Sequence, residues 1–292
     1  MSVLGVDVGG TFLRMGLYGG DAVERPVKRL SAEVFGGEAG AAEGLARALR
    51  DYLAGERVEA VGVGVPGTLS RDGATVLNVP NIPALNGLPL RAALEAALGV
   101  PVFVENDITM LLTGDALRLG LTEGVVYGFY LGTGLGGAVL VDGELLRGRS
   151  GLCEPGHVPV YGLDRPCGCG KRGCAQAYVA GKALQELRDA RWPELPIEKV
   201  FTAMSEGELA EYVEILANVL VSAVQILDPE AVVMGGGVCA MEGFPREALL
   251  RRARELCMAP VPAGTLRLLY PPQDPFSGVY GAAVFAGRAL NR

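Results

Sequence analysis

Apolar and polar residues follow two patterns along the chain, and together they predict an α/β protein. Short, mostly apolar runs predict strands at Val3–Val8, Phe12–Tyr18, Val58–Val65, Val100–Val104, Gly124–Leu131, Ala138–Val141, Ala231–Met234 and Leu266–Tyr270. Apolar residues at helical spacing predict helices at Ala39–Leu53, Leu90–Leu98, Ile108–Leu119, Gly181–Arg191, Glu208–Leu227 and Gly278–Leu290. Strands and helices that alternate in this way are typical of α/β folds.

A predicted hairpin with a glycine and threonine tip occurs twice, once in each half of the chain. The residues of the two tips are Asp7, Val8, Gly9, Gly10, Thr11 and Gly132, Thr133, Gly134, Leu135, Gly136, Gly137. The second tip has the spacing G-x-G-x-x-G, but it precedes a strand instead of a helix, so it does not fit a Rossmann motif. The repetition predicts two similar lobes whose tips face each other and grip a polyphosphate.

The chemistry of these glycine-rich segments fits a nucleotide. Gly9 and Gly10 let backbone N–H groups approach an anion, and Asp7 can hold a hydrated Mg²⁺ ion near phosphates. Gly-Gly is also an ordinary hairpin turn, so the first tip alone leaves both interpretations open. A third segment, Gly235, Gly236 and Gly237, either lets an adenine ring lie against the backbone or forms a plain strand-to-helix turn.

Length and composition narrow the class of protein. The 292 residues exceed the size at which one core usually stops growing, which favours two domains. The net charge of −7 and the absence of basic clusters argue against a nucleic-acid partner. No apolar run near 18 residues indicates a membrane span, and no secretory signal is recognisable, so we expect a cytoplasmic protein.

The only histidine of the chain and three of its six cysteines predict a structural zinc site. His157, Cys167, Cys169 and Cys174 offer one imidazole and three thiolates, a set that suits tetrahedral Zn²⁺. Free thiols in a glycine-rich loop and disulfides are the alternatives, and a reducing cytosol disfavours the disulfides. Because Glu154 lies three residues before His157, we expect the zinc knuckle to support a binding site.

Polar residues at strand ends are candidates for ligand binding. Asn106 and Asp107 follow a predicted strand and open a helix, which is the usual ligand position of α/β sheets. Asn106 offers a donor and an acceptor, and with the neighbouring carboxylate it can fix a pair of hydroxyls. Asp107 could instead be only the N-cap of the helix, and Asn81 only a turn residue between prolines.

Taken together, the motifs resemble those of the ROK family of bacterial sugar kinases, over the whole chain. That family belongs to the actin-like ATPase superfamily of duplicated ribonuclease-H-like domains. The matching segments are the two tips, the adenosine motif Gly235–Val238, and the zinc-knuckle signature Glu154–His157 with its three cysteines. The resemblance implies a two-lobed α/β fold with a zinc knuckle, residues 1–113 plus 275–292 forming the N-terminal lobe and residues 114–274 the C-terminal lobe.

The resemblance also implies an activity and its residues. It implies ATP and Mg²⁺ as cofactors beside the structural Zn²⁺, closure of the lobes over the substrates, and Asp107 as the general base. The residues implied to hold sugar hydroxyls are Asn81, Asn106, Glu154 and His157. Gln176 stands where the family usually has a glutamate that contacts the sugar near its anomeric end, so we expect altered recognition at that end.

The substrate expected from the resemblance is an aldohexose phosphorylated at its 6-hydroxymethyl group. The segments Pro80–Pro83 and Gly235–Glu247 favour D-allose, with glucokinase and N-acetylmannosamine kinase as alternatives. A ROK transcriptional repressor would need a helix-turn-helix before the first strand, and because that strand begins at Val3 we expect no repressor. A non-catalytic sugar-binding regulator of the same fold is a further alternative, which Gln176 leaves open. We expect a homodimer whose partners are the sugar and ATP, with no nucleic acid and no membrane.

Overall fold

The chain forms two compact units. The structure, a computed structural model, describes residues 2–20, 22–36, 40–149 and 153–291. The first unit consists of Met1–Arg118, Arg147–Gly151 and Gln273–Arg292, and the second of Leu119–Leu146 and Leu152–Pro272. The chain therefore passes from one unit to the other four times.

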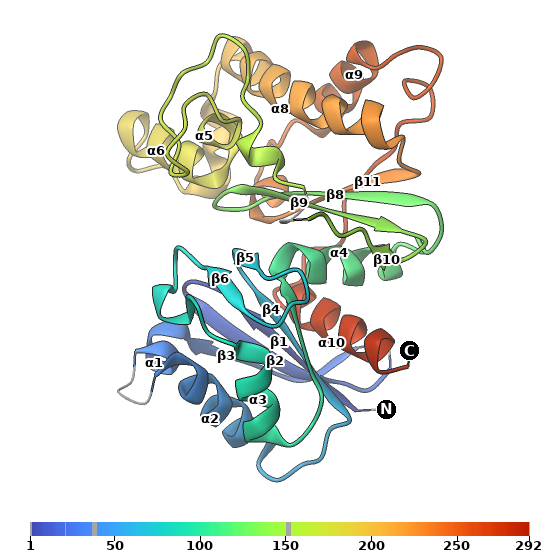
Figure 1. Cartoon of the computed structure of the whole chain (residues 1–292). Coiled ribbons are helices and arrows are strands. Elements are labelled where there is room, and N and C mark those ends of the chain that lie inside the picture. The colour runs from blue at the N-terminus through green and yellow to red at the C-terminus, as the bar shows by residue number, and fades with distance from the viewer. Residues whose placement is uncertain (1, 21, 37–39, 150–152, 292) are drawn as a thin grey trace. The chain divides into compact units, whose positions relative to one another are not determined.

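The first unit is built on a five-stranded sheet with the order β3-β2-β1-β4-β7 (Figure 1). Its strands are β1 (Val3–Val8), β2 (Phe12–Tyr18), β3 (Val23–Leu30), β4 (Ala60–Val65) and β7 (Val102–Asn106). The strands β1, β2 and β3 pair antiparallel in sequence, whereas β4 lies parallel to β1 and β7 parallel to β4. A separate small sheet joins β5 (Thr68–Leu69) and β6 (Val76–Asn78).

The second unit repeats this arrangement with the order β10-β9-β8-β11-β12. Its strands are β8 (Val125–Leu131), β9 (Leu135–Val141), β10 (Glu144–Leu145), β11 (Ala231–Gly235) and β12 (Leu268–Leu269). Again three strands pair antiparallel in sequence, and two parallel strands follow on the other side of the first. The repetition predicted from two hairpins thus extends to whole sheets.

Helices and one-turn 3-10 segments (η) surround both sheets. Those of the first unit are α1 (Ser31–Phe35), α2 (Ala41–Leu53), η1 (Pro83–Leu85), α3 (Leu90–Leu98), α4 (Asp107–Arg118) and α10 (Ser277–Leu290). Those of the second unit are η2 (Pro155–His157), α5 (Gln176–Val179), α6 (Gly181–Arg191), η3 (Ile197–Lys199), α7 (Val200–Ala203), α8 (Glu206–Leu227), η4 (Gly237–Ala240) and α9 (Arg246–Leu256).

The alternation of side chains along β1 explains how helices cover both faces of the first sheet. Leu4 and Val6 point into the main core, which also contains the buried faces of α2 and α3. Gly5 points the other way and meets α10, where a Cβ would lie 2.1 Å from the Val279 carbonyl oxygen. The last helix of the chain therefore lies directly on the first sheet (Figure 1).

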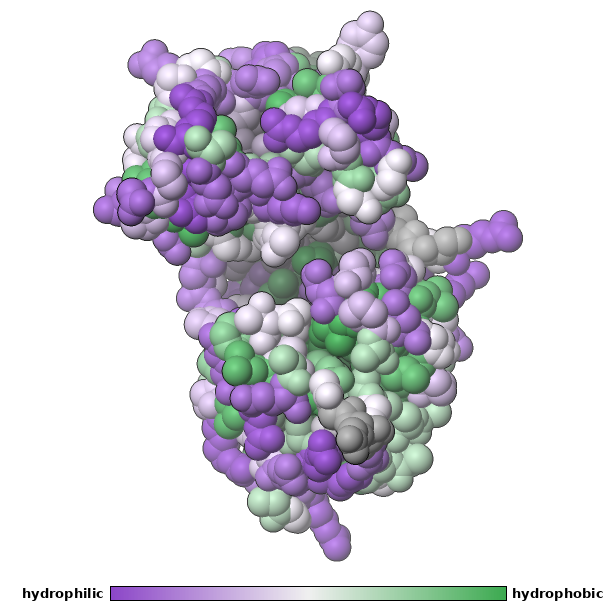
Figure 2. Space-filling model, turned by 90° about the vertical axis from the view of Figure 1, so that its left-hand side faces the viewer, coloured by the Kyte–Doolittle hydropathy of each residue, from purple (hydrophilic) through white to green (hydrophobic). Residues whose placement is uncertain are grey.

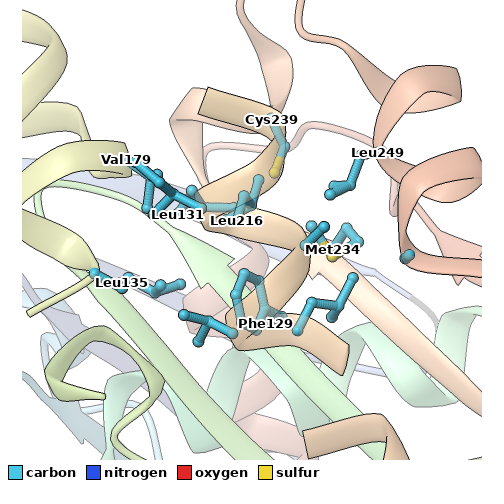
Figure 3. Close-up of a cluster of buried hydrophobic side chains, with 14 of the residues drawn as sticks. Phe129, Leu131, Leu135, Val179, Leu216, Met234, Cys239 and Leu249 are labelled. Atoms are coloured by element: carbon cyan, nitrogen blue, oxygen red, sulfur yellow. The ribbon is translucent and has the colours of Figure 1, made fainter. Parts of the chain in front are cut away.

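The core of the second unit lies between β8, β11 and α8. Phe129, Leu131, Leu216 and Met234 meet there from the two strands and the helix (Figure 3). By length and composition α8 could cross a membrane, but half of its most apolar window is buried inside the second unit. That burial is typical of the core helix of a globular domain.

Several elements differ from the sequence-based prediction. The edge strand β3 was not predicted, because its exposed charged residues interrupt the apolar alternation. The strand predicted at Val100–Val104 lies at Val102–Asn106, and Gly136 and Gly137 lie inside β9 instead of in the turn. The predicted first residue of α2, Ala39, lies outside the described residues.

Hydrophilic residues cover most of the second unit on the face shown in Figure 2, whereas hydrophobic residues are interspersed among polar ones on the first unit. The large hydrophobic side chains that are exposed in the described residues are Leu30, Leu77, Leu146, Val158, Tyr161, Ile226, Met258 and Val261.

Candidate active site and zinc cluster

The turn between β1 and β2 exposes backbone N–H groups and bonds its carbonyl groups inward. The Gly9 oxygen accepts a hydrogen bond from Ser31 Oγ at 2.6 Å, and the Thr11 oxygen accepts one from the Ser31 N–H at 3.0 Å. Gly10 and Thr11 are exposed, and their own N–H groups make no hydrogen bond to any residue that the structure describes. A turn with this polarity attracts anions.

The turn between β8 and β9 has the same polarity. The Gly132 oxygen accepts from the Gly181 N–H at 2.8 Å, and the Thr133 oxygen accepts from the Lys182 N–H at 3.1 Å. Thr133 and Gly134 are exposed, and within the described parts of the chain their N–H groups have no hydrogen-bond partner. In each unit the carbonyl groups of the tip are thus tied to the start of a helix, α1 or α6, and the N–H groups face solvent.

Asp7, predicted to hold Mg²⁺, lies at the end of β1 and is paired with Arg14. Arg14 Nη1 donates to Asp7 Oδ2 at 3.2 Å, and the Asp7 side chain is 19 % exposed. Burial raises the pKa of the Asp7 carboxyl, and the Arg14 guanidinium opposes that rise. The structure therefore gives Asp7 a cationic neighbour that the sequence pattern did not indicate.

Asn106 ends β7, and Asp107 begins α4. Asn106 Oδ1 accepts from the Ile108 N–H at 2.9 Å, and its Nδ2 donates to the Gly67 oxygen at 3.0 Å. Asp107 Oδ1 also accepts from the Ile108 N–H at 2.9 Å. Asn106 Oδ1 also accepts from the Thr109 N–H at 3.4 Å, so Asn106 is the N-cap of α4, and Asp107 is its first helical residue.

Asn81 belongs to the same end of the first sheet. A Cβ added to Gly10 would lie 3.1 Å from Asn81 Cβ, so this exposed asparagine packs beside the first glycine turn. The turn follows β1, and Asn106 and Asp107 lie at the end of β7, which runs in the same direction as β1. The carboxyl ends of β1 and β7 therefore bring three of the predicted residues to one edge of the sheet.

An ion pair between the buried Glu105 and the exposed Arg147 supports this edge, and no sequence pattern indicated it. Glu105 is 8 % exposed, and its Oε2 lies 2.6 Å from Arg147 Nη1. Its Oε1 accepts from the Asn106 N–H at 2.9 Å. Glu105 and Arg147 are separated by 41 residues, and neither belongs to a charge run or a motif. The sequence therefore contains no local pattern that predicts this pair.

Close packing explains most of the glycines at Gly235, Gly236 and Gly237. A Cβ on Gly235 would lie 2.3 Å from the Tyr130 ring, and Gly236 has φ +90° with the Leu131 carbonyl oxygen 2.2 Å from its Cβ position. Only Gly237 has open space around it. The close packing of β11 on β8 therefore accounts for two of the three glycines, and Gly237 is the one that leaves room for a ligand.

His157, Cys167, Cys169 and Cys174 form the predicted metal cluster, with all four ligand atoms within 4.8 Å of one another. Cys167 Sγ lies 3.7 Å from His157 Nδ1, and Cys169 Sγ lies 3.7 Å from Cys174 Sγ. Zn–S bonds of about 2.3 Å give ligand separations of about 3.8 Å in a tetrahedron, so the donor set and its size fit Zn²⁺. The sulfur atoms are too far apart for disulfides.

The cluster is linked to its surroundings through Cys167 and His157. Burial opposes ionisation of the Cys167 thiol, but hydrogen bonds from the Cys169 N–H, the Gln176 amide and the other cluster thiols lower its pKa to about 6. His157 uses Nδ1 toward Cys167, which leaves Nε2 on the other side of the ring. Glu154 directly precedes η2 and is exposed.

The sequence profile of the ROK family matches residues 3–289, so this chain belongs to the ROK family. The glucokinase of Thermotoga maritima is 30 % identical over 308 residues, covering 97 % of this chain and 96 % of that protein. The N-acetyl-D-glucosamine kinase of Vibrio cholerae is 35 % identical over 254 residues, covering 80 % and 83 %.

Solved structures support the same grouping. The ROK hexokinase from Thermus thermophilus superimposes with a TM-score of 0.81 and 32 % identity, covering 100 % of this chain and 99 % of that chain. A ROK family glucokinase from Streptomyces griseus, solved with glucose and AMPPNP, gives a TM-score of 0.80 and 27 % identity, covering 99 % and 100 %. The predicted actin-like α/β fold of the ROK kinases is thereby confirmed, and so is the cluster of zinc ligands within it.

Proposed function

We propose that this chain is an ATP-dependent sugar kinase that transfers the γ-phosphoryl group to the 6-hydroxymethyl group of an aldohexose. The observation that carries the proposal is the matching polarity of the two glycine turns. In each turn the carbonyl groups are bonded to the start of a helix and two N–H groups are exposed without partners among the described residues. Two such turns suit the several negative charges of a nucleoside triphosphate.

Nucleotide binding follows from these turns. Residues proposed to form the nucleotide site are Asp7, Gly9, Gly10, Thr11, Gly132, Thr133, Gly134, Gly136, Gly235, Gly236 and Gly237; of the last three, Gly237 is the one with open space for a direct contact. Mg²⁺ bound with the phosphates would neutralise their charge, and Asp7 is the carboxylate that would hold its water ligands. The relative from Streptomyces griseus was solved with AMPPNP, which supports ATP as the donor.

Asp107 is the proposed general base. Its carboxylate lies at the N-terminus of α4, where the helix dipole stabilises negative charge. An ionised carboxylate there would accept the proton of the attacking hydroxyl group. We propose that Asn81 and Asn106 of the first unit, and Glu154 and His157 of the second, bind sugar hydroxyls.

Glucose is the first candidate among the aldohexoses. The relatives reported above are named glucokinase, hexokinase and N-acetyl-D-glucosamine kinase, and none of them is named for D-allose. D-allose and N-acetylmannosamine stay as predictions to be tested. Allose differs from glucose only at carbon 3, and a polar group left unpaired by the wrong epimer costs about 1–3 kcal/mol, or about 5- to 150-fold in kcat/KM.

A coupled assay of ADP release over glucose, N-acetylglucosamine, mannose, N-acetylmannosamine and allose tests this proposal. We expect turnover with at least one of these sugars, the highest kcat/KM with glucose, and a product phosphorylated at the 6-hydroxyl group by ³¹P NMR. A higher kcat/KM with allose would restore the D-allose assignment. Sugar binding by calorimetry without any ADP release would replace the kinase with a sugar-binding regulator.

We also propose that the protein acts in the cytoplasm as a homodimer, with the sugar and ATP as its partners and without nucleic acid or membrane. The net charge of −7 supports the absence of a nucleic-acid partner. Sedimentation velocity of the purified protein measures the oligomeric state directly.

A further inference from the structure

Gln176 connects the zinc cluster to the second glycine turn through the two ends of its amide. Its Oε1 accepts a hydrogen bond from the Leu135 N–H at 3.4 Å, and its Nε2 donates to Cys167 Sγ at 3.4 Å. Because Leu135 offers only a donor there, the amide oxygen has to face Leu135, and the NH₂ group has to face the sulfur. One side chain thus satisfies the turn and a zinc ligand together.

The amide is enclosed by two glycines that leave just enough space for it. A Cβ on Gly134 would lie 3.0 Å from Gln176 Oε1, and a Cβ on Gly156 would lie 2.7 Å from the same oxygen. Gly156 is buried in η2, directly before the zinc ligand His157. The amide oxygen is therefore packed between the glycine turn and the segment that carries Glu154 and His157.

The residues beside these hydrogen bonds are anchored in the core of the second unit. Leu135 and Val179 are buried, and both side chains point into the cluster around Leu216 (Figure 3). Leu135 is the first residue of β9, and Val179 is the last residue of α5, the helix that Gln176 begins. Their buried side chains therefore anchor the start of the strand and the end of the helix. The two hydrogen bonds and the two glycines beside the amide oxygen leave the Gln176 side chain little freedom to turn toward a bound sugar.

An amide suits this position better than a carboxylate for an electrostatic reason. Zn²⁺ with three thiolates and a neutral imidazole carries a net charge of −1 (2 − 3), so a neutral N–H donor stabilises the cluster. A glutamate here would keep the acceptor for the Leu135 N–H but lose the donor. It would also place a second negative charge beside the Cys167 sulfur.

We propose that Gln176 is a positioning residue that holds the zinc ligand Cys167 and fixes the second glycine turn, and that it is not a ligand of the sugar. This reassigns the role that the family resemblance implied for position 176. The phosphate-binding role of this turn rests on the proposed function, whereas the contact between Gln176 and the zinc ligand Cys167 does not.

Two substitutions distinguish the effect of the amide donor from that of the amide acceptor. Gln176→Glu keeps the size and the acceptor but loses the donor, and Gln176→Met loses both. Gln185 provides the matched control, because its Nε2 bonds Asp189 on the exposed side of α6, away from the cluster. Gln185→Glu and Gln185→Met are therefore expected to behave like the wild type.

The first measurement is the rate at which the zinc-loaded protein releases Zn²⁺ to a chromogenic chelator. Loss of a hydrogen bond to a metal ligand typically costs about 10- to 100-fold in metal affinity, so we expect both variants to release zinc faster by that order, with the larger effect in Gln176→Glu. In the Co²⁺-substituted protein, the thiolate-to-cobalt absorption is expected to shift in both variants. Release rates and spectra equal to those of the wild type would overturn the proposal, whether or not the chain is a kinase.

The second measurement determines KM for ATP and for the sugar with zinc present in excess. It distinguishes a role of Gln176 at the glycine turn from a role in sugar binding. We expect the KM for ATP to rise in Gln176→Met and to stay near the wild-type value in Gln176→Glu, because only the methionine loses the acceptor for Leu135. The KM for the sugar is expected to change by less than about threefold in both. A tenfold or larger rise of the sugar KM, about 1.4 kcal/mol, with unchanged zinc release would show that Gln176 is a sugar ligand after all.

Discussion

Asp107 is the residue on which the proposed chemistry depends most directly. It is the first residue of α4, so its carboxylate lies beside the N–H groups of the helix start, and its Oδ1 accepts from the Ile108 N–H at 2.9 Å. These contacts fix the side chain and stabilise its charge. In its proposed role as the base, a side chain held in this way needs no rearrangement before it accepts a proton.

Replacement of Asp107 by asparagine is expected to lower kcat by about 10²- to 10⁴-fold and to leave the KM for the sugar nearly unchanged. Asparagine has the same shape but cannot accept the hydroxyl proton. The matched control is Asp51→Asn, which removes an exposed carboxylate on α2 of the same unit. Wild-type turnover of the Asp107 variant in the ADP-release assay would assign the base elsewhere.

Asn106 illustrates what residue identity alone leaves open. The sequence indicated a side chain with a donor and an acceptor next to a carboxylate, and both features are present. In the structure the donor already bonds the Gly67 oxygen, and the acceptor already bonds the start of α4. Its contribution to sugar binding therefore has to come from the remaining donor and acceptor capacity of the amide.

At the scale of elements, the zinc knuckle is a loop that its own residues cannot stabilise. Gly170 and Gly173 have φ angles of +87° and +75°, and a Cβ on Gly173 would lie 2.4 Å from the Leu163 carbonyl oxygen. Isolated bridges at Pro159–Cys174 and Pro166–Arg172 are its only strand pairings among the described residues. The metal is therefore expected to supply much of the free energy that keeps the knuckle folded.

Elemental analysis of protein purified without chelator is expected to return one zinc per chain. Iodoacetamide at about pH 7.5 should label Cys167, Cys169 and Cys174 only after a chelator removes the metal, because bound thiolates are protected. Cys239 serves as the internal control: burial raises its pKa to about 12, so it should stay unlabelled in both samples. Equal labelling of the three thiols with and without chelator would argue against the zinc site.

At the scale of the whole molecule, the first unit is completed by the C-terminal end of the chain. α10 crosses α4 at two glycines: a Cβ on Gly281 would lie 1.8 Å from the Met110 carbonyl oxygen, and a Cβ on Gly114 would lie 2.9 Å from Gly281 Cα. This approach lets α10 cover β1 and β4 closely. The stability of the unit that carries Asp107 therefore depends on residues near the end of the sequence.

Gly281→Ala is expected to destabilise the first unit by about 1–3 kcal/mol or more, because the added methyl group has no room at this crossing. Hydrogen exchange should accelerate in β1, β4 and α4, while β8 and β11 of the second unit keep their protection. The control is Gly207→Ala in the first turn of α8, where the added Cβ would point into open space, with no atom of another segment within 4 Å. Unchanged exchange in the Gly281 variant would refute this packing argument.

The sequence by itself determined the features that local spacing encodes. Helices α3 (Leu90–Leu98) and α6 (Gly181–Arg191) were predicted with the bounds that the structure has, because apolar periodicity fixes them within one segment. The four zinc ligands could be named for a similar reason, since one histidine and three cysteines fall within 18 residues and only one metal chemistry suits them. The repeated hairpins likewise predicted the repeated sheets.

The tertiary structure alone decided which distant residues contact one another. The pairing of Glu105 with Arg147, the bond of Gln176 to Leu135 and the contact of Gly281 with Met110 join positions 41 or more residues apart. Each depends on how strands and helices pack after they form, and such contacts leave no periodic pattern in the chain. Candidate ligand and catalytic residues can thus be predicted from the sequence. The residues that position them can be identified only from the folded structure.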